Sequence, residues 1–327
     1  MLTRRQFSGS LAAPFLAATE VLAQPLTQVG KTVRLVVPFA PGQGSDILAR
    51  AMAQQLALRW NQPVTVENKP GANGSIAATE VARASGDGHT ILVTSNSPIV
   101  INPNLYKKLT YDPVTELTAI KLMGLADLAI LVGTQSPAKT LPDLIALLKS
   151  RPGKLSFGSP GVGSTSHMAT QLLMQLTGTD MVHVPYKGSS QAMTDLIGGQ
   201  IDVMIDALPS SLTMAKNGRV RMLALTGNRA SIFAPDVPTA ASLGINGLPF
   251  GGWYGVFVPA TTPTPLSARI STDLTTVMQS SDIIQRLKDQ FIEPVPSSMT
   301  IPFAEFVRNE IAFWEKTARS LNLYRTE

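Results

Sequence analysis

Runs of β-branched and other apolar residues alternate with segments of helical periodicity from about residue 30 to residue 260. In the helical segments apolar residues recur every three or four positions, as at Met168, Leu172 and Leu176, which is typical of an amphipathic helix. Short apolar runs bounded by turn residues predict strands. We expect strands at residues 33–37, 63–66, 90–94, 128–132, 155–158, 181–184, 201–205, 220–225 and 253–258. Such alternation predicts parallel sheets with helices on their faces.

The C-terminal segment changes to a purely helical pattern. Its apolar residues share one face of the expected helix, and they are Phe303, Phe306, Val307, Ile311, Trp314, Ala318 and Leu321. Aromatic stripes of this kind mostly pack into a core, so we expect core packing here rather than a cofactor or partner surface.

The same local motif occurs twice, about 120 residues apart: a strand ends in a Gly/Pro/Ser turn that opens a helix. The first copy is VRLVVPFAPGQGSD (33–46) and the second is LSFGSPGVGSTSH (155–167). Glycines let backbone N–H groups turn toward a ligand, and we expect the last hydroxyl or carboxylate of each turn to cap its helix. Helix N-termini attract anions because their first N–H groups are unpaired and the dipole is positive there. The two turns therefore predict two walls of one anion-binding cleft.

Polar residues after two other strands extend this predicted cleft. Ser95 and Asn96 follow the strand at 90–94, and Tyr186 and Lys187 follow the strand at 181–184. Ligands of open parallel sheets bind beyond the carboxyl ends of the strands, where all these residues fall. We expect Tyr186 to offer a flat apolar face with a hydroxyl, and Lys187 to be a solvated loop charge rather than a carboxylate partner.

Length and composition bound the class of protein. The chain has 327 residues, enough for two hydrophobic cores, with 44% hydrophobic and 15% charged residues. The net charge of +5 comes from scattered Lys and Arg, which argues against a nucleic-acid partner. The chain has no cysteine, which excludes disulfides, thiolate metal sites and a cysteine nucleophile.

Residues 1–23 are typical of an export signal. Arg4 and Arg5 form a twin-arginine pattern, residues 11–18 form a short apolar region, and Ala23 ends a small-residue cleavage site. We expect cleavage after Ala23 and a soluble protein beginning at Gln24, because the apolar stretch is too short to span a bilayer.

The sequence supports an enzymatic function less well than it supports anion binding. His89, His167 and His183 lack metal-ligand spacing, and the chain has neither an H-E-x-x-H nor a G-x-S-x-G motif. Gly42 and Gly44 follow a strand, with Glu67 ending the next, as in a dinucleotide-binding turn, but Ile47 stands at the third glycine. An exported nicotinamide-dependent oxidoreductase with a degenerate turn therefore remains the alternative.

Several segments together resemble a known family. VPFAPGQGSDILAR, VENKPGANGSIA, GDGHTILVTSNS, NPNLYKKLTYDP, FGSPGVGSTSHMA, HVPYKGSSQAMTDLIGGQIDVMIDA, LALTGNRA, APDVPT and WYGVFVPATTP closely resemble the Bug-type solute receptors of tripartite tricarboxylate transporters. The resemblance runs from about Val33 to the C-terminus. It implies a periplasmic two-lobed binding protein that closes on a small carboxylate and delivers it to a membrane permease or a sensor. In that family backbone N–H and hydroxyl groups of the β–α turns hold the carboxylate, often through waters, rather than a fixed arginine.

The resemblance and the two turns give one set of expectations. We expect an α/β fold of the two-lobed periplasmic binding type (type II-like), each lobe a mostly parallel sheet flanked by helices. Lobe 1 would comprise residues 24–127 plus 250–327 and lobe 2 residues 128–249, joined near residues 128–132 and 253–258. We expect a monomer without cofactor, metal or catalytic residue. The predicted ligand-binding residues are Phe39, Ala40, Pro41, Gly42, Gln43, Gly44, Ser45, Asp46, Ser95, Asn96, Ser159, Gly161, Gly163, Ser164, Thr165, His167, Tyr186 and Lys187.

Three departures from the family pattern bear on the ligand. Gln43 and Asn73 stand where the family usually has glycine, and His89 where it usually has tyrosine. We expect these changes to alter ligand selectivity rather than the fold. Dicarboxylates, tricarboxylates, amino acids, nicotinate-like acids and aromatic acids all remain open.

Overall fold

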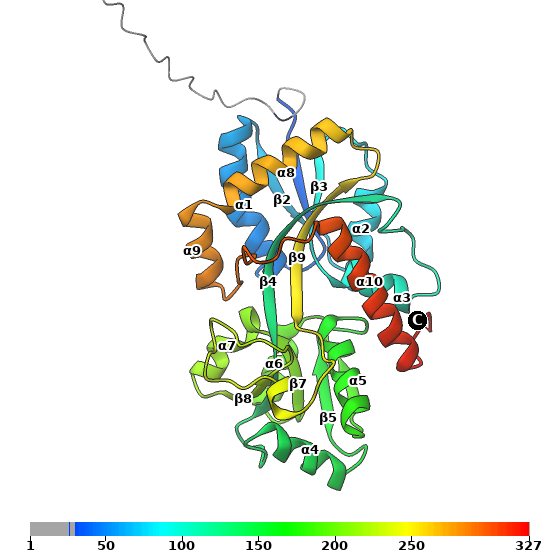
Figure 1. The fold of residues 1–327 in the computed structure, drawn as a ribbon, viewed down its shortest axis with the longest axis vertical. Helices are drawn as coiled ribbons and strands as arrows, with labels where there is room; N and C mark the ends of the chain where they lie inside the picture. Colours follow the sequence, from blue (N-terminus) through cyan, green and yellow to red (C-terminus); the bar gives the residue numbers. More distant parts are fainter. Residues whose placement is uncertain (1–25, 27–29, 327) are drawn as a thin grey trace, which may run out of the picture.

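A computed structural model of the chain describes residue 26 and residues 30–326, so the expected export signal lies outside the described residues. Figure 1 shows two lobes, one above the other, with helices on both faces of the strands. The strands follow the order β2-β1-β3-β9-β4-β7-β5-β6, and β8 pairs with β4. The expected α/β, two-lobed architecture is confirmed.

The upper lobe in Figure 1 combines the N-terminal and C-terminal parts of the described chain. Its elements are β1 (Val33–Val37), α1 (Gly44–Trp60), β2 (Val64–Asn68), η1 (Ala72–Gly74), α2 (Ser75–Ala82), β3 (Thr90–Ser95), η2 (Ser97–Ile101), α3 (Asn102–Leu105), β9 (Gly251–Pro259), α8 (Thr264–Met278), α9 (Ser281–Asp289) and α10 (Phe303–Ser320). The lower lobe is built from α4 (Leu141–Ser150), β5 (Ser156–Ser159), α5 (Thr165–Thr177), β6 (Val182–Pro185), α6 (Ser189–Ile197), β7 (Val203–Ala207), α7 (Leu208–Lys216), β8 (Val220–Leu225) and η3 (Ala241–Leu243).

One long strand, β4 (Leu117–Gly133), runs through both lobes. Its first part pairs with β9 down to Asp127 and Gly251, and from Leu128 onward it pairs with β7 and β8. The partners therefore change between Asp127 and Leu128. Every expected strand is present, but the expectation at residues 128–132 covers only the second part of β4.

Antiparallel pairing is more frequent than expected. Parallel pairing joins β1 to β2 and β3, and β5 to β6 and β7, whereas β3–β9, β9–β4, β4–β7 and β4–β8 are antiparallel. The reason is the path of the chain, because β4 runs out of the upper lobe and β9 runs back into it. The sheet is therefore mixed at its centre and parallel toward its two ends.

Four clusters of buried apolar side chains cover the two faces of the sheet in each lobe. The expected stripe of α10 supplies Phe306, Val307, Trp314 and Ala318 to one of them, as predicted. Met168 of α5 in the lower lobe belongs to the same cluster. The apolar core therefore extends from the upper lobe to α5 of the lower lobe.

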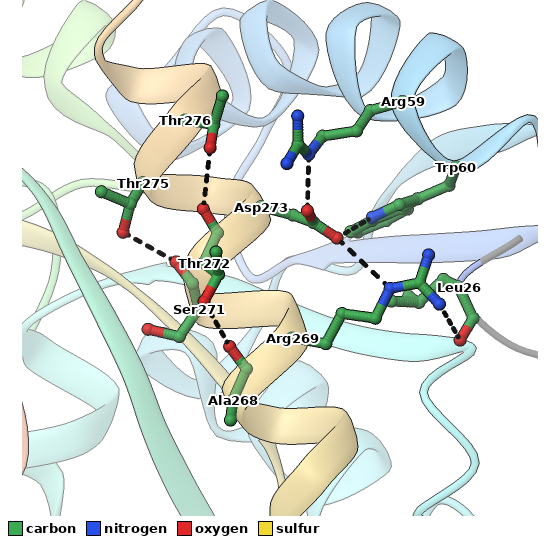
Figure 2. Close-up of polar contacts among 10 residues, drawn as sticks. All are labelled: Leu26, Arg59, Trp60, Ala268, Arg269, Ser271, Thr272, Asp273, Thr275 and Thr276. Carbon is green, nitrogen blue, oxygen red and sulfur yellow. Dashed lines mark hydrogen bonds and ion pairs between the residues drawn. The ribbon is translucent and has the colours of Figure 1, made fainter. Parts of the chain in front are cut away.

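A buried carboxylate ties the C-terminal end of α1 to α8 (Figure 2). Asp273 accepts hydrogen bonds from Arg59 Nε at 2.5 Å and from Trp60 Nε1 at 2.8 Å, and Arg269 Nε lies 3.7 Å from it. Arg269 also reaches the carbonyl of Leu26 at 3.5 Å. This contact fixes the helix that carries the first glycine turn from its far end.

Candidate ligand-binding site

The first glycine turn lies between β1 and α1, where its residues were expected to form a site. Helix α1 begins at Gly44 after Gln43, which occupies the N-cap position in an extended conformation without a side-chain cap. The expectation that Asp46 caps this helix is wrong. Asp46 lies in the first turn, and its carboxylate accepts hydrogen bonds from Gly42 N at 2.9 Å, Asn68 Nδ2 at 2.9 Å and Arg50 Nε at 3.0 Å.

Through these contacts the ionised side chain of Asp46 stabilises the first glycine turn. Burial opposes its ionisation, but the hydrogen bonds from Arg50, Gly42 and Asn68 outweigh that cost and lower its pKa. Asn68 also donates to the carbonyl of Phe39 at 2.9 Å. Asp46 and Asn68 therefore stabilise the loop from Phe39 to Gly42, which includes Ala40 and Pro41.

Two residues of the predicted ligand-binding set each have a buried side-chain atom without a hydrogen-bond partner within the described part of the chain. These atoms are Ser45 Oγ, in the first turn of α1, and Asn96 Nδ2, just beyond β3. Each residue is only 1% exposed. An unpaired buried polar group costs on the order of 1–3 kcal/mol, which a hydrogen bond to a bound molecule would recover.

A hydroxyl group of the second glycine turn caps its helix. Ser164 precedes α5, and its hydroxyl accepts the backbone N–H of His167 at 3.1 Å. Gly161 and Gly163 both have positive φ, which a residue with a Cβ rarely adopts. The Ser159 hydroxyl contacts the carbonyl of Gly161 at 3.1 Å. The turn is therefore closed by its own hydroxyl groups.

Two stacked histidine rings contact the second turn through hydrogen bonds. The rings of His167 and His183 lie 4.3 Å apart, and Phe157 stacks on His183 at 4.7 Å. Nδ1 of His167 accepts the N–H of Gly163 at 3.3 Å, and Nε2 of His183 lies 2.7 Å from the hydroxyl of Ser159. Burial, with the neighbouring His183, lowers the pKa of His167 to about 3, and burial lowers that of His183 to about 4. Both rings are neutral at physiological pH.

The second turn contacts the upper lobe directly. Thr165 Oγ1 donates to Asn96 Oδ1 at 2.9 Å and lies 3.1 Å from the hydroxyl of Ser97. Asn73 Nδ2 donates to the carbonyl of Gly163 at 2.8 Å. The structure thus brings Gly163 and Thr165 of one lobe together with Asn96 of the other.

The first turn has its own contacts across the cleft. A Cβ on Gly188, which precedes α6, would lie 3.0 Å from Nε2 of Gln43. A Cβ on Gly44 would overlap the hydroxyl of Tyr254 on β9. Gly44 is therefore required where a buried tyrosine approaches the start of α1, and Gln43 lies beside the loop that carries Tyr186 and Lys187.

The remaining predicted residues differ in how closely they join this site. Tyr186 is half-buried and donates to Asp195 Oδ2 at 2.6 Å. Lys187 is exposed, and no ion pair holds it within the described residues, in agreement with a solvated loop charge. Ser95 ends β3 next to Asn96 and is half-buried.

The comparisons with known proteins agree on one family. The family model described as "Tripartite tricarboxylate transporter family receptor" matches residues 48–323. The chain belongs to this family. Protein BugT from Bordetella pertussis is 30% identical over 92% of this chain and 94% of its own.

Two solved structures show the same fold as this receptor chain. Rpa4515 from R. palustris, solved with adipate, is 32% identical with a TM-score of 0.82, covering 89% of this chain and 97% of its own. MatC from Rhodopseudomonas palustris, solved with bound malate, is 32% identical with a TM-score of 0.81, covering 88% and 98%. The oxidoreductase alternative finds no support in these comparisons.

One departure from the receptor family pattern lies away from the site. His89 precedes β3, at the opposite end of that strand from Asn96, and its Nδ1 is 3.2 Å from Asp87. The expectation that His89 bears on the ligand is therefore wrong, because a strand places its two ends at opposite edges of the sheet. Asn73, in contrast, reaches the second turn directly.

Sequence reasoning missed several residues that lie beside the predicted site. Asn102, Tyr254 and Asp206 lie far from either glycine turn in the sequence, and only the fold brings them near. Asn96 was in the predicted set, but the sequence could not show that its Nδ2 is buried without a partner among the described residues. Within the described ranges, the structure contains neither a group of acidic residues and histidines that could hold a metal ion nor a helix long and apolar enough to cross a membrane.

Proposed function

We propose that this receptor binds a small organic carboxylate between its two glycine turns. The observation that carries the proposal is a pair of buried polar atoms without a hydrogen-bond partner among the described residues: Ser45 Oγ, in the first turn of α1, and Asn96 Nδ2, just beyond β3. Two relatives, solved with adipate and with bound malate, support a carboxylate of this size. Asn96 Nδ2 and the first N–H groups of α1 are donors suited to an anion.

Lobe closure is the functional event in this proposal. The two turns belong to different lobes, so both can hold one carboxylate only when the lobes approach each other. A ligand that prefers this arrangement shifts an open–closed equilibrium toward it. The change of strand partners between Asp127 and Leu128 supports the division into residues 24–127 plus 250–327 and residues 128–249.

Export and delivery complete the proposal. Arg4 and Arg5 support export by the twin-arginine route, with cleavage after Ala23 and a periplasmic monomer as the product. The receptor would deliver its ligand to a tripartite tricarboxylate-type permease or to a sensor, without a cofactor. Replacing Arg4 and Arg5 by lysine should abolish twin-arginine export, and unchanged export that is blocked by inhibiting the general secretory pathway would contradict this route.

The ligand is found by a thermal-stability screen of dicarboxylates, tricarboxylates, amino acids and aromatic acids, followed by calorimetry. Native mass spectrometry of gently purified protein is a parallel search for a co-purified acid. We expect one class of carboxylate to stabilise the protein by about 2.7 kcal/mol at a hundredfold excess over its dissociation constant.

The variant Ser45→Ala tests the site itself. It removes an unpaired hydroxyl, so folding stability should hold or rise slightly, whereas affinity for the acid should fall about tenfold. The control is Ser190→Ala, since Ser190 is an exposed serine on α6. Failure of every acid to bind would overturn the proposed function, and wild-type affinity in Ser45→Ala would overturn this placement of the site.

A further inference from the structure

A buried carboxyl group lies near the end of β7, and no positive side chain of the described residues pairs with it. Asp206 is 2% exposed and accepts hydrogen bonds from Ser189 Oγ at 2.8 Å and from Ser210 Oγ at 2.5 Å. Among the residues that the structure describes, no Lys, Arg or His forms an ion pair with it. A buried carboxylate held only by neutral donors carries a large desolvation cost, which its protonation removes.

Asp206 is linked to the first glycine turn through two neighbouring residues. Its partner Ser189 is the first residue of α6, and Gly188, just before it, adjoins Gln43 of the first glycine turn. The phenol of Tyr254, buried against Gly44 at the start of α1, is close enough that Asp206 and burial together raise its pKa. Asp206 is thus linked to the first glycine turn through a residue of each lobe, Ser189 of α6 and Tyr254 of β9.

The surroundings of Asp206 set its charge near neutral pH. Burial raises its pKa to about 6, against the opposing effect of the hydrogen bonds from Ser210, Ser189 and the backbone of Ala207. Tyr254 of β9 is the titratable side chain close to Asp206. Helices α6 and α7 place the hydroxyl groups of Ser189 and Ser210 against its carboxyl group, and Ala129 of β4 is its partner in the sheet. An anion brought into the cleft adds a repulsion that only the charged form of Asp206 experiences.

We propose that the receptor takes up a proton on Asp206 when it closes on its carboxylate ligand. This inference rests on the proposed function and adds its regulation: the ligand is bound as an anion together with one proton. Asp206 is a positioning residue in this scheme, because its neutral carboxyl keeps Ser189 and the start of α6 in place without repelling the ligand.

The pH dependence follows by linkage. Below about pH 6 Asp206 is already neutral, so binding takes up no proton and affinity is constant. Above about pH 6 the free receptor carries the charge and must be protonated on binding, so the association constant falls by up to tenfold per pH unit. The two histidines of the second turn titrate lower, with pKa values of about 3 and 4, and stay neutral throughout this range.

The experiment measures proton uptake by calorimetry at pH 7.5 in two buffers of different ionisation enthalpy. The probes are malate, adipate and the acid that stabilises the protein most in the screen, of which malate and adipate are fully ionised at this pH. We expect uptake approaching one proton in the wild type and none in Asp206→Asn, whose neutral amide has a similar shape. That variant should also bind at pH 8 at least as tightly as the wild type.

The matched control is Asp195→Asn, on the same helix, where the carboxylate accepts the Tyr186 hydroxyl nearer to solvent. It should leave proton uptake unchanged. Binding by the wild type without proton uptake would overturn the inference and leave the proposed function intact, as would loss of binding in a folded Asp206→Asn variant. If none of the acids binds, the proposed function fails and this inference fails with it.

Discussion

At the scale of single residues, the second glycine turn depends on a neutral histidine. Nδ1 of His167 accepts the N–H of Gly163, and this acceptor is lost when the ring is protonated. The ring is also stacked on His183, which in turn stacks on Phe157, and a charge is poorly solvated there. His167 was predicted to contact ligand, and the structure gives it a second role as a support of the turn.

We expect acid to destabilise the protein through His167. Its pKa of about 3 in the folded state lies below the unfolded value of about 6.5, so the unfolded chain binds more protons between these limits. Stability contributed by the neutral ring is complete above about pH 6.5 and falls as the pH drops, by about 2 kcal/mol at pH 5. In His167→Asn the amide oxygen can still accept from Gly163, and the dependence on pH should flatten. Chemical denaturation at pH 8 and pH 5 measures the loss of unfolding free energy with acid in the wild type and in the variant. Equal losses in the two proteins would contradict the role of this ring.

The glycine at position 163 gives a ranking of binding effects. Its φ is +77°, and an added Cβ would lie 3.1 Å from Asn73 Nδ2 and 3.2 Å from Leu105 Cδ1. We therefore expect Gly163→Val to abolish carboxylate binding, Ser164→Ala to weaken it by on the order of 1–3 kcal/mol, and Lys187→Ala to change it little. Calorimetry on folded variants gives the order. If Lys187→Ala lost binding while Gly163→Val retained it, the carboxylate would be held by an ion pair with Lys187 rather than by the N–H groups at the start of α5.

At the scale of elements, the α1–α8 contact shows how a distant ion pair positions the first turn. Asp273 is buried and joins Arg59, Trp60 and Arg269, whereas the ion pair between Asp282 and Arg286 on α9 is half exposed on both sides. Breaking a buried pair leaves charges without partners, but an exposed pair contributes little. The two aspartates therefore form a matched comparison.

We expect Asp273→Asn to lower the free energy of unfolding by about 3 kcal/mol and Asp282→Asn by less than about 1 kcal/mol. Denaturant titration of both variants measures the difference. If the two losses were equal, the contact shown in Figure 2 would not be a significant constraint on α1.

Local patterns predicted the elements better than they predicted contacts between them. The strands and the caps such as Ser164 follow from apolar periodicity and from side chains a few residues away. The length of β4 was missed because residues 117–127 contain Lys121 and Gly124, which interrupt the apolar run that marks a strand. Asp206 and Tyr254 could not be assigned, since their proximity arises only from the pairing of β4 with β7 and β9.

At the scale of the whole molecule, a few contacts hold the second turn against the upper lobe. They are the hydrogen bonds from Asn73 to Gly163, from Thr165 to Asn96 and between Thr165 and Ser97, together with the apolar contacts of Met168. At the far end of α5, Gln175 donates to the carbonyl of Ser320 at 2.7 Å. Opening the lobes must break these contacts, so their strength sets part of the open–closed equilibrium.

Removing the polar contacts should favour the open arrangement. Asn73→Gly suits the left-handed backbone at this position, with φ +47°, and Thr165→Val keeps the shape while deleting the hydroxyl. Each hydrogen bond contributes about 1 kcal/mol, so the double variant should shift the equilibrium by about tenfold or more and weaken ligand binding accordingly. Solution scattering should show a larger radius of gyration than in the wild type, and saturating carboxylate should restore compaction. The control is Thr170→Val, because the Thr170 hydroxyl donates to the Ser166 carbonyl within α5 and its loss should leave the radius unchanged. An unchanged radius and affinity in the double variant would show that apolar contacts, rather than these hydrogen bonds, hold the lobes together.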